Sequence, residues 1–432
     1  MIGAGYVGLV SGASFSDLGN KVYCVDKDKK KINILNLGKS TIYEPGLDEI
    51  IKKNHNAGRL IFTTDVVKAV KNSDIIFICV GTPSKKNSKS VDLTFLYQAV
   101  KKIIKNTKNK KKIIVTKSTV PIGTGDQIEK LLKKNKRNNF EIISNPEFLR
   151  EGEAIRDFKY PDRIVIGSNN KKIFKIMKKL YQPIINKGAK FFTTSRKGAE
   201  LIKYASNAFL ATKITFINEL ANLCEKAQVN IEDVSLGIGS DTRIGSRFLR
   251  AGPAYGGSCF PKDTKGLIST SDKFKTNLSL VKSVIKSNEN RKILLTKRID
   301  KIFGKKLKNK KVSFLGVTFK PNTDDMRDSS SLLMIPYLSK KGALVSYYDP
   351  SGEKNIFKKI KNVKYVNSIK NLCRDADLLI LHTEWDEFKA LDFKKLVKKK
   401  NFTIYDLRNL YNPSEMLEKK IKYFSIGRPN IN

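Results

Sequence analysis

A thiol, an ammonium group and a carboxylate fall within five residues of one another in a glycine-rich segment. Cys259 follows a pair of glycines, and Lys262 and Asp263 come three and four residues after it. Glycine lets the backbone approach a ligand closely, and a thiolate beside a cation is an activated nucleophile. Cys259 and Asp263 would lie on the first turns of a helix, whose N-terminus favours the thiolate. The segment therefore predicts a nucleophilic cysteine.

The other cysteines are Cys24, Cys79, Cys224 and Cys373. Cys24 and Cys79 lie in apolar runs that are typical of buried strands, where a cysteine acts as a small hydrophobic residue. None of the four follows a glycine pair. An odd number of widely spaced cysteines, with no C-x-x-C pair, argues against a disulfide framework or a zinc site and favours a reducing cytoplasm.

A dinucleotide-binding pattern occurs at the N-terminus, where Gly3, Gly5 and Gly8 fit G-x-G-x-x-G. The first glycine would allow a tight turn, the second the approach of a pyrophosphate and the third close packing of helix on strand. Asp26 ends the next predicted strand, at the position of an acid that binds the ribose. It favours NAD over NADP because a 2′-phosphate would be repelled, although Lys31 lies nearby. A glycine-rich turn without a ligand is the alternative.

Only Met1 and Ile2 precede Gly3, whereas a strand averages about five to six residues. The first strand of a dinucleotide-binding domain is central to its sheet. We therefore expect either a true start upstream of Met1 or a truncated strand, and we expect that a few restored apolar residues before Gly3 would raise both stability and NAD affinity.

Lys203 and Asn207 are four residues apart in a predicted helix over Glu200–Ala227, so they share one face. An ammonium group and an amide that point together into a cleft can hold an oxyanion or a sugar hydroxyl. A helical lysine is usually solvated, but the residues from 201 to 209 are mostly apolar. A catalytic interpretation is therefore favoured.

Two carboxylates, Glu147 and Glu151, flank Phe148-Leu149-Arg150 after a predicted strand. They would position or activate water, or they would be surface carboxylates. Their spacing does not decide between the two.

These residues need elements to position them, and the chain alternates strand-like and helical patterns in two regions. Ligands of such sheets lie beyond the carboxyl ends of the strands. The region between, about 197 to 301, is helical. The pattern predicts an α/β protein with two Rossmann-like doubly wound domains, joined by a central helical domain with a long spine helix. The predicted strands are Lys21–Val25, Ile75–Val80, Lys112–Thr116, Glu141–Ser144, Arg163–Ile166, Val312–Gly316, Leu344–Tyr348, Ala376–Leu381 and Phe402–Tyr405.

The chain has 432 residues and a formal net charge of +43, and no run of apolar residues is long enough to predict a membrane span. Such a charge is compatible with nucleic-acid binding. The lysines are spread along the whole chain and no basic stretch has interleaved aromatic residues. We therefore favour a lysine-rich surface that attracts anionic substrates, without nucleic-acid or membrane partners.

Taken together, the motifs resemble the UDP-glucose/GDP-mannose dehydrogenase family of nucleotide-sugar dehydrogenases. The matching residues run in order along almost the whole chain. They are Gly3–Gly8, Lys117-Ser118-Thr119-Val120-Pro121, Asn145–Gly152, Pro161–Gly167, Lys203 with Asn207, Gly256–Asp263, and Gly316-Val317-Thr318-Phe319-Lys320-Pro321 followed by Arg327.

The resemblance implies an NAD-binding domain over 1–196, a central helical dimerisation domain over 197–300 and a UDP-sugar-binding domain over 301–432. It implies oxidation of UDP-glucose to UDP-glucuronate by a homodimer, with two NAD molecules per sugar and no metal. Cys259 would be the nucleophile, and Lys203 and Asn207 would stabilise the oxygen on the sugar C6. Asp263 and Glu147, with Thr119, would handle protons and the hydrolytic water.

The resemblance also implies the ligand contacts. Contacts to NAD beyond the glycines would come from Val7, Asp26, Lys31, Thr119, Glu151, Lys262 and Arg327. Contacts to the substrate would come from Glu147, Phe148, Leu149, Arg150, Glu151, Lys203, Asn207, Phe248, Leu249, Arg250, Ala251, Gly252, Gly256 and Lys320. Arg243 would reach the substrate of a neighbouring subunit, and Arg408 is a looser match to a substrate arginine.

Three alternatives remain. A different sugar nucleotide, such as GDP-mannose or UDP-N-acetylmannosamine, would use the same chemistry, although the residues after Cys259 and the run from Asn145 to Gly152 are more similar to the UDP-glucose branch. A two-electron dehydrogenase of the 6-phosphogluconate type would need no cysteine. A basic nucleic-acid-binding protein would show binding that falls steeply with salt and no NAD-dependent turnover.

Overall fold

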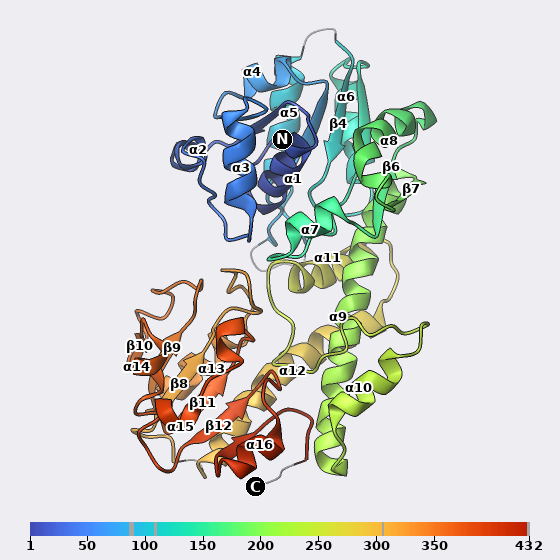
Figure 1. Ribbon diagram of the computed structural model, residues 1–432. Helices are drawn as coiled ribbons and strands as arrows, with labels where there is room; N and C mark the ends of the chain where they lie inside the picture. The colour runs from blue at the N-terminus through green and yellow to red at the C-terminus, as the bar shows by residue number, and fades with distance from the viewer. Residues whose placement is uncertain (86–89, 108–109, 305, 430–432) are drawn as a thin grey trace. The chain divides into compact units, whose positions relative to one another are not determined.

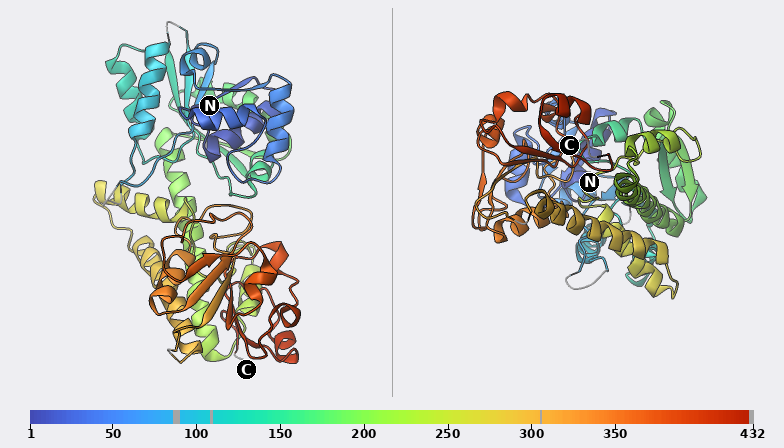
Figure 2. Two further views of the ribbon diagram at one scale, coloured as in Figure 1. Left: turned by 90° about the vertical axis from the view of Figure 1, so that its left-hand side faces the viewer. Right: turned by 90° about the horizontal axis from the view of Figure 1, so that it is seen from below.

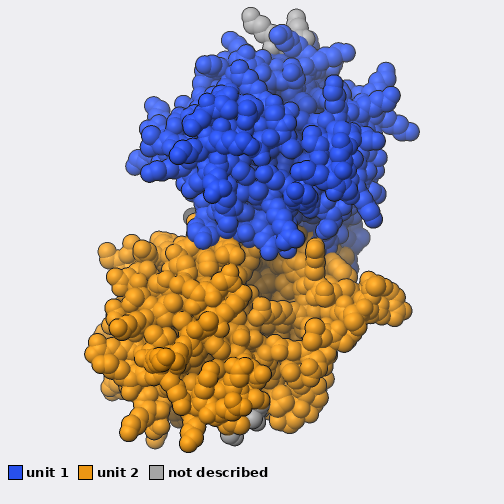
Figure 3. Space-filling model, in the orientation of Figure 1, with its two compact units in different colours: residues 1–206, 265–277 blue, residues 207–264, 278–432 orange. Residues whose placement is uncertain are grey.

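The computed structural model describes residues 1–432 except 86–89, 108–109, 305 and 430–432 (Figure 1). The chain divides into two compact units, one formed by residues 1–206 and 265–277 and the other by residues 207–264 and 278–432 (Figure 3). Helix α9 (Arg196–Ala227) and helix α11 (Phe260–Lys273) each contribute to both units. No helix in the described ranges combines the length and the apolar character that crossing a membrane requires.

The first unit is a Rossmann-like domain. Its helices and strands are α1 (Tyr6–Asp17), β1 (Val22–Val25), α2 (Lys29–Asn36), α3 (Leu47–Asn56), β2 (Leu60–Thr63), α4 (Val66–Lys71), β3 (Ile75–Ile78), α5 (Thr94–Asn106), β4 (Lys112–Thr116), α6 (Thr124–Lys134), β5 (Phe140–Ser144), α7 (Ala154–Lys159), β6 (Arg163–Gly167), α8 (Lys171–Ile185) and β7 (Lys190–Thr194).

The first strand is reduced to an isolated bridge at Ile2. Ile2 forms parallel bridges to both Val25 and Ile78, so it links the pair β1–β2 to the sheet of order β3-β4-β5-β6-β7. With Ile2 in the first position, the spatial order becomes that of a dinucleotide-binding sheet. The benefit expected from a longer strand stays a prediction. One detail differs from a purely parallel sheet, because β6 pairs antiparallel to β5.

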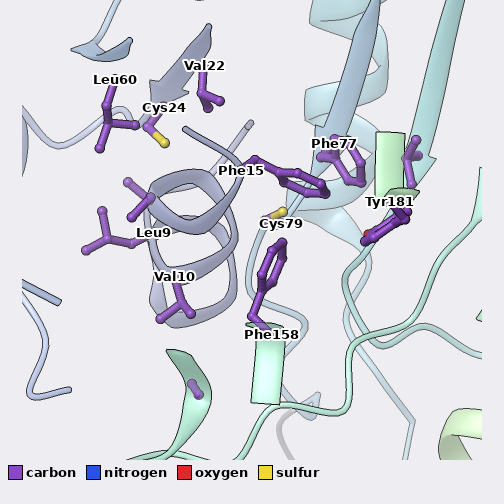
Figure 4. Packing of buried hydrophobic residues seen from close by; sticks show 14 of the residues in the cluster. Leu9, Val10, Phe15, Val22, Cys24, Leu60, Phe77, Cys79, Phe158 and Tyr181 are labelled. Carbon is purple, nitrogen blue, oxygen red and sulfur yellow. The ribbon is translucent and has the colours of Figure 1, made fainter. Parts of the chain in front are cut away.

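An aromatic cluster joins four elements of this domain. The ring of Phe15 on α1 lies 5.3 Å from that of Phe77 on β3, 4.9 Å from that of Phe158 on α7 and 5.3 Å from that of Tyr181 on α8 (Figure 4). Phe15 is only 2% exposed. Tilted and edge-on aromatic pairs stabilise a core beyond the area they bury, so this cluster fixes α1 on the sheet.

The central region is helical, as predicted, with α9, α10 (Ile231–Gly239), α11 and α12 (Ser279–Ile302). The first turns of α9 are attached to the N-terminus of α6. Glu200 accepts hydrogen bonds from the backbone N–H groups of Gly123 (2.6 Å) and Gly125 (2.8 Å) and from the hydroxyl of Ser144 (2.9 Å). A carboxylate at a helix N-terminus is stabilised by the helix dipole. The direction of α9, and with it the position of Lys203 one turn later, therefore depends on Glu200.

The C-terminal region is a second Rossmann-like domain within the other unit (Figure 2). Its elements are β8 (Lys311–Leu315), α13 (Ser331–Lys340), β9 (Leu344–Tyr348), β10 (Val363–Tyr365), α14 (Ile369–Cys373), β11 (Leu378–Leu381), the 3₁₀ turn η1 (Asp386–Phe388), α15 (Phe393–Leu396), β12 (Thr403–Asp406), α16 (Pro413–Glu418) and β13 (Lys422–Phe424).

Its six strands are all parallel, in the order β10-β9-β8-β11-β12-β13. This order places the topological switch point between β8 and β11, where such sheets bind ligands beyond the strand ends. Phe314 and Ile380 face a core cluster shared with α12 and α13, whereas Leu315 and Leu381 face one formed with α14, α15 and α16. Apolar residues on both faces explain why these strands read as continuous hydrophobic runs.

Candidate functional site

The glycine motif begins after the bridge at Ile2 and extends into helix α1, which contains Gly8. Gly3 has φ +99°, and a Cβ there would lie 2.7 Å from the carbonyl oxygen of Cys79. A Cβ on Gly8 would lie 1.9 Å from the carbonyl oxygen of Gly3. Gly5, the residue before α1, has no heavy atom within 4 Å of such a Cβ. The first and third glycines are therefore required by packing, while the second borders open space at a helix N-terminus, which suits a diphosphate.

Asp26 lies beside this motif at the end of β1. Its carboxylate accepts hydrogen bonds from the N–H groups of Ala4 (3.0 Å) and Asp28 (3.1 Å), and Lys31 lies 3.5 Å away. Burial tends to raise the pKa of Asp26, but these backbone donors and the Lys31 charge outweigh it and lower the pKa. Asp26 is therefore ionised at neutral pH, as an acceptor for ribose hydroxyls must be. The glycine turn and this acid together fit NAD.

A buried ion pair joins β5 to helix α9. Lys203 Nζ lies 2.9 Å from Glu147 Oε1, and the two side chains are only 4% and 6% exposed. The other oxygen of Glu147 accepts the N–H of Leu149 (2.6 Å). Burial tends to raise the pKa of Glu147, but the Lys203 charge and hydrogen bond, the Leu149 N–H and the Lys117 charge together lower it. Glu147 is thus a buried carboxylate whose charge is balanced by Lys203.

Sequence reasoning gave Lys117 no role, although it begins a motif that matched the family. Its Nζ lies 3.4 Å from Asn145 Oδ1 and 3.5 Å from the hydroxyl of Tyr181. Burial lowers the pKa of Lys117 to about 8, against the opposing influence of Cys79 and Glu147, while Lys203 lowers it further. Lys117 therefore contributes to the electrostatics of the Glu147–Lys203 pair from inside the domain.

Glu44 was also missed, and it holds the segment that follows Glu147. Its carboxylate accepts the N–H groups of Gly152 (2.7 Å) and Ala154 (2.7 Å) and the hydroxyl of Tyr6. Because Tyr6 begins α1, Glu44 connects the cofactor motif to the end of the Asn145–Gly152 motif. A glutamate before Pro45-Gly46 carries no local signal that would reveal this contact.

Phe148 is packed between two cations, with Arg163 4.1 Å and Lys203 5.4 Å from its ring. Arg150 forms bonds to Asp157 of 3.0 and 2.7 Å, so its guanidinium already has a partner on α7. The remaining predicted residues of the first unit are Val7 on α1, Leu149 and Glu151 beside Phe148, and Thr119, whose carbonyl oxygen accepts the hydroxyl of Thr82 at 2.9 Å.

Cys259 immediately precedes α11, and its carbonyl oxygen accepts the N–H of Asp263 (2.8 Å). The other four cysteines are buried, whereas Cys259 is partly exposed. Asp263 is 1% exposed and accepts from Asn207 Nδ2 (2.6 Å) and Lys262 Nζ (2.5 Å). The predicted helix start at the thiol is confirmed, and Asp263 orients the amide of Asn207.

Some of the substrate residues predicted in the second unit, among them Arg250, Gly252 and Arg408, lie beside the switch point of the C-terminal sheet. Arg408 donates to the carbonyl oxygens of Phe319 (2.6 Å) and His382 (2.8 Å) and pairs with Glu384 (2.9 Å). Arg250 donates to the carbonyl oxygen of Arg408 at 2.8 Å. A Cβ on Gly252 would lie 3.4 Å from Arg408, and one on Gly256 would lie 2.8 Å from the carbonyl oxygen of Asp328. Lys320, Phe248, Leu249 and Ala251 belong to the same loops.

The two arginines predicted for other contacts lie on the surface of this unit. Arg327 is 67% exposed and paired with Asp325, and Arg243 is 87% exposed and paired with Asp241. The predicted residues are thus distributed over both units. Helix α9 carries Lys203 in its part of the first unit and Asn207, one turn later, in its part of the second.

Three family models match this chain in sequence order. They are the NAD binding domain (residues 1–185), the central domain (197–290) and the UDP binding domain (313–413) of the UDP-glucose/GDP-mannose dehydrogenase family. Among curated proteins, the UDP-glucose 6-dehydrogenase of Rhizobium meliloti (strain 1021) is 48% identical, with 100% of this chain and 99% of that protein covered.

Solved structures give the same family. A UDP-glucose dehydrogenase from the hyperthermophilic archaeon Pyrobaculum islandicum has a TM-score of 0.89 at 32% identity, covering 98% of this chain and 96% of that one. A UDP-D-ManNAc dehydrogenase from Pyrococcus horikoshii has a TM-score of 0.86 at 25% identity, covering 99% and 98%.

The space around Gly5 yields the first prediction. Because a Cβ meets nothing at Gly5 but would collide with the backbone at Gly8, Gly5→Ala should leave thermal unfolding unchanged while NAD affinity falls about tenfold or more. Gly8→Ala should lower both the melting temperature and NAD affinity. Calorimetric titration with NAD and a thermal melt of each variant measure this. Unchanged NAD affinity in Gly5→Ala would show that no diphosphate lies there.

The Glu147–Lys203 pair yields a pH prediction. A carboxyl group with a lowered folded-state pKa adds stability above its unfolded pKa of about 4.3, and this contribution disappears as the pH falls through the folded value. The melting temperature of the wild type should therefore exceed that of Glu147→Gln at pH 7. This difference in melting temperature should shrink as the pH falls below the unfolded-state pKa and should disappear below the folded-state pKa. Glu153→Gln, at a carboxylate 46% exposed, is the control and should show no such gap. A gap that stays constant with pH would contradict the lowered pKa.

Proposed function

Because the chain belongs to the UDP-glucose/GDP-mannose dehydrogenase family, we propose that it oxidises UDP-glucose to UDP-glucuronate with NAD. The observation that carries this proposal is the placement of Cys259, a partly exposed thiol at the start of α11 with Asn207 and Asp263 hydrogen-bonded to each other beside that turn. An alcohol dehydrogenase that stops at the aldehyde has no need of such a thiol. A thiol that captures the aldehyde allows a second oxidation to the acid.

Bound NAD accepts a hydride in each of the two oxidation steps. The first removes a hydride from C6 of the sugar while the hydroxyl proton passes to a base, which gives the aldehyde. Lys203 and Asn207 hold the oxygen on C6, because an ammonium group and an amide N–H stabilise the negative charge that develops there. Glu147 keeps the Lys203 ammonium oriented, and Asp263 does the same for the Asn207 amide.

In the second half of the reaction, the sulfur of Cys259 forms a bond to C6 of the aldehyde. The electrons of the carbonyl double bond move onto the oxygen that Lys203 and Asn207 hold. Loss of the second hydride restores the carbonyl as a thioester. Water then attacks C6, its proton goes to a carboxylate, and the C–S bond breaks to return the thiolate. Glu147 and Asp263 are the two candidates for this base, because both carboxylates are buried, and the resemblance to the family adds Thr119 to the same proton-handling set.

The UDP part of the substrate would bind at the switch point of the C-terminal sheet. Lys320, Arg250 and Arg408 bring positive charge to loops beside β8 and β11, which suits a diphosphate. The rest of the predicted contact set, Phe248–Gly252 and Gly256, lies on the neighbouring segment. We further propose that regions 1–196, 197–300 and 301–432 serve as the NAD-binding, dimerisation and UDP-sugar-binding parts.

A second candidate substrate is another sugar nucleotide, and the comparisons include one such relative. UDP-glucose is favoured because the 48% identity to a UDP-glucose 6-dehydrogenase extends over the full chain, against 25% for the UDP-D-ManNAc dehydrogenase. The cytoplasm remains our expectation for where the reaction occurs.

We propose a homodimer, formed through α9. Phe209, Phe216 and Leu223 are 67%, 50% and 62% exposed, and their spacing of seven residues places them along one side of the helix. An exposed apolar stripe of this kind indicates an interface. In such a dimer the exposed Arg243 would contribute to the partner's substrate site.

The stoichiometry of NADH tests the reaction. Purified protein with limiting UDP-glucose should release two NADH per sugar, and Cys259→Ala should form no acid. GDP-mannose and UDP-N-acetylmannosamine, assayed in parallel, should give much lower kcat/KM. Release of one NADH per sugar, or normal acid formation by Cys259→Ala, would remove the thiol from the mechanism.

The role of Arg243 is tested by mixing two inactive variants. In a mixed dimer of Cys259→Ala and Arg243→Ala, the subunit that keeps its cysteine receives Arg243 from its partner, so random pairing should restore about a quarter of the wild-type activity. When both variants also carry Phe216→Glu, which places a charge on the α9 stripe, this recovery should disappear. No recovery in the mixed sample would mean that Arg243 acts within its own subunit or that no dimer forms.

A further inference from the structure

The segment that leads to Cys259 has no regular secondary structure, yet side chains from elsewhere bind its backbone. Asn218 on α9 accepts the N–H of Gly252 (2.8 Å), and Arg291 on α12 donates to the carbonyl oxygen of the same residue (3.2 Å). Asn288, also on α12, accepts the N–H of Tyr255 (2.9 Å) and donates to its carbonyl oxygen (3.1 Å). Two residues of the segment are therefore held on both their donor and acceptor groups.

The three side chains that make these bonds are themselves buried. Asn218 is 3%, Asn288 2% and Arg291 4% exposed. Arg291 also donates to the carbonyl oxygen of Asn218 (3.0 Å) and to Asn222 Oδ1 (2.6 Å), so the guanidinium fixes α9 and α12 to one another as well as to the segment. Burial lowers its pKa to about 10, which leaves it charged at neutral pH. These bonds use Nε and Nη1 of Arg291, while Nη2 is buried without a hydrogen-bond partner among the described residues. Buried polar bonds of this kind favour one arrangement of the chain.

The other end of the segment is held from the C-terminal domain. The N–H of Gly257 donates to the carbonyl oxygen of Arg327 (2.7 Å), and the N–H of Ser258 donates to Asp325 Oδ2 (3.0 Å). Backbone positions on the approach to Cys259 are thus fixed from α9, from α12 and from the loop after β8. All of these residues belong to the second unit.

Between the held residues Gly252 and Tyr255, the backbone is strained. Ala254 has φ +109°, in a region that residues with a Cβ rarely adopt. Such a conformation persists only where the surrounding structure enforces it, and it is found preferentially at functional sites. Tyr255 directly follows Ala254, and Gly252 lies two residues before it, so the bonds to these two residues constrain the backbone before and after Ala254.

We propose that Asn288, together with Asn218 and Arg291, is a positioning residue that imposes the strained path of residues 252–255 and thereby places the thiol of Cys259 at the start of α11. None of the three touches the thiol, and they act through the backbone of the segment. The proposal rests on the proposed function for the role of Cys259 and adds the groups that determine where this thiol lies.

The test uses the full-length protein without substrate. Iodoacetamide should label Cys259 in preference to the other four cysteines, which are buried, and peptide mapping identifies the site. In Asn288→Ala the thiol should leave its place at the helix N-terminus, so labelling at pH 7 should slow and its pH profile should shift upward. The kcat for UDP-glucose should fall by about 100-fold, the usual effect of a displacement of about 1 Å at a reacting group.

A double-mutant cycle separates positioning from general stability. In the Ala254→Gly background the segment follows the same path without strain, so Asn288→Ala should there slow labelling and turnover much less than it does in the wild type. Thr296→Ala is the matched control, because Thr296 is a buried polar residue on α12 whose hydroxyl donates within the helix to the carbonyl oxygen of Lys292 at 2.7 Å. It should lower the melting temperature but leave the labelling rate unchanged.

Two results would overturn the proposal. The first is an unchanged labelling rate in Asn288→Ala. The second is that Asn288→Ala reduces labelling and turnover equally in the wild-type and the Ala254→Gly backgrounds. If Asn288→Ala does not fold, Asn218→Ala, which removes only the acceptor for the Gly252 N–H, tests the same expectations. Labelling needs no sugar substrate, so the positioning role can fail while Cys259→Ala still abolishes acid formation. Conversely, the labelling cycle can succeed even where the NADH stoichiometry argues against UDP-glucose oxidation.

Discussion

The buried pair of Lys203 and Glu147 is the interaction on which the first unit depends. Two charges with side chains only 4% and 6% exposed are costly to remove from water, and each is tolerable only while the other stays 2.9 Å away. The partners come from elements that are distant in the sequence, the loop after β5 and the second turn of α9. Helix α9 must therefore begin at a fixed place and direction, and Arg196 and Glu200 bind α6 to ensure this. The position of Asn207, one turn beyond Lys203, follows from the same constraint.

Several buried carboxylates perform a common task, since they accept backbone N–H groups of loops and of the first turns of helices, which have no partner within a helix or sheet. Glu44 holds Gly152 and Ala154, Glu200 holds Gly123 and Gly125, Asp325 holds Ser258, and Asp349 holds Val317 and Thr318. Bonds of this kind are charge-assisted and stronger than neutral ones. The segments that they hold include the end of the Asn145–Gly152 motif, the residue before Cys259 and the loop after β8.

Sequence patterns predicted the centres of the sheets but not their edges. The strands that were missed, β2, β7, β10 and β13, all lie at the edge of a sheet. These edge strands are partly exposed, so they lack the continuously buried apolar run of β4 or β11. The site was predicted through local motifs, such as the glycines and the segment of Cys259. The pairs Lys203–Glu147 and Asn207–Asp263 could not be predicted, because each joins residues that are remote in the sequence. Glu44 and Asn288 carry no local signal at all.

The basic composition of the chain is confined to its surface and does not extend to its interior. The chain has 84 lysines and arginines against 41 acids, yet among the residues that the structure describes the buried set contains seven acids (Glu44, Glu147, Glu200, Asp263, Asp325, Asp349 and Asp406) and seven bases (Lys112, Lys117, Arg196, Lys203, Arg291, Lys292 and Arg428). A surface position accepts lysine in place of almost any residue at little cost in free energy. The positions of the buried acids do not accept lysine. A lysine in place of Glu200 would face the positive end of α6, and a lysine in place of Glu147 would face the Lys203 ammonium group away from solvent. Lysine can therefore replace other residues only where no backbone N–H or buried ammonium group needs an acceptor.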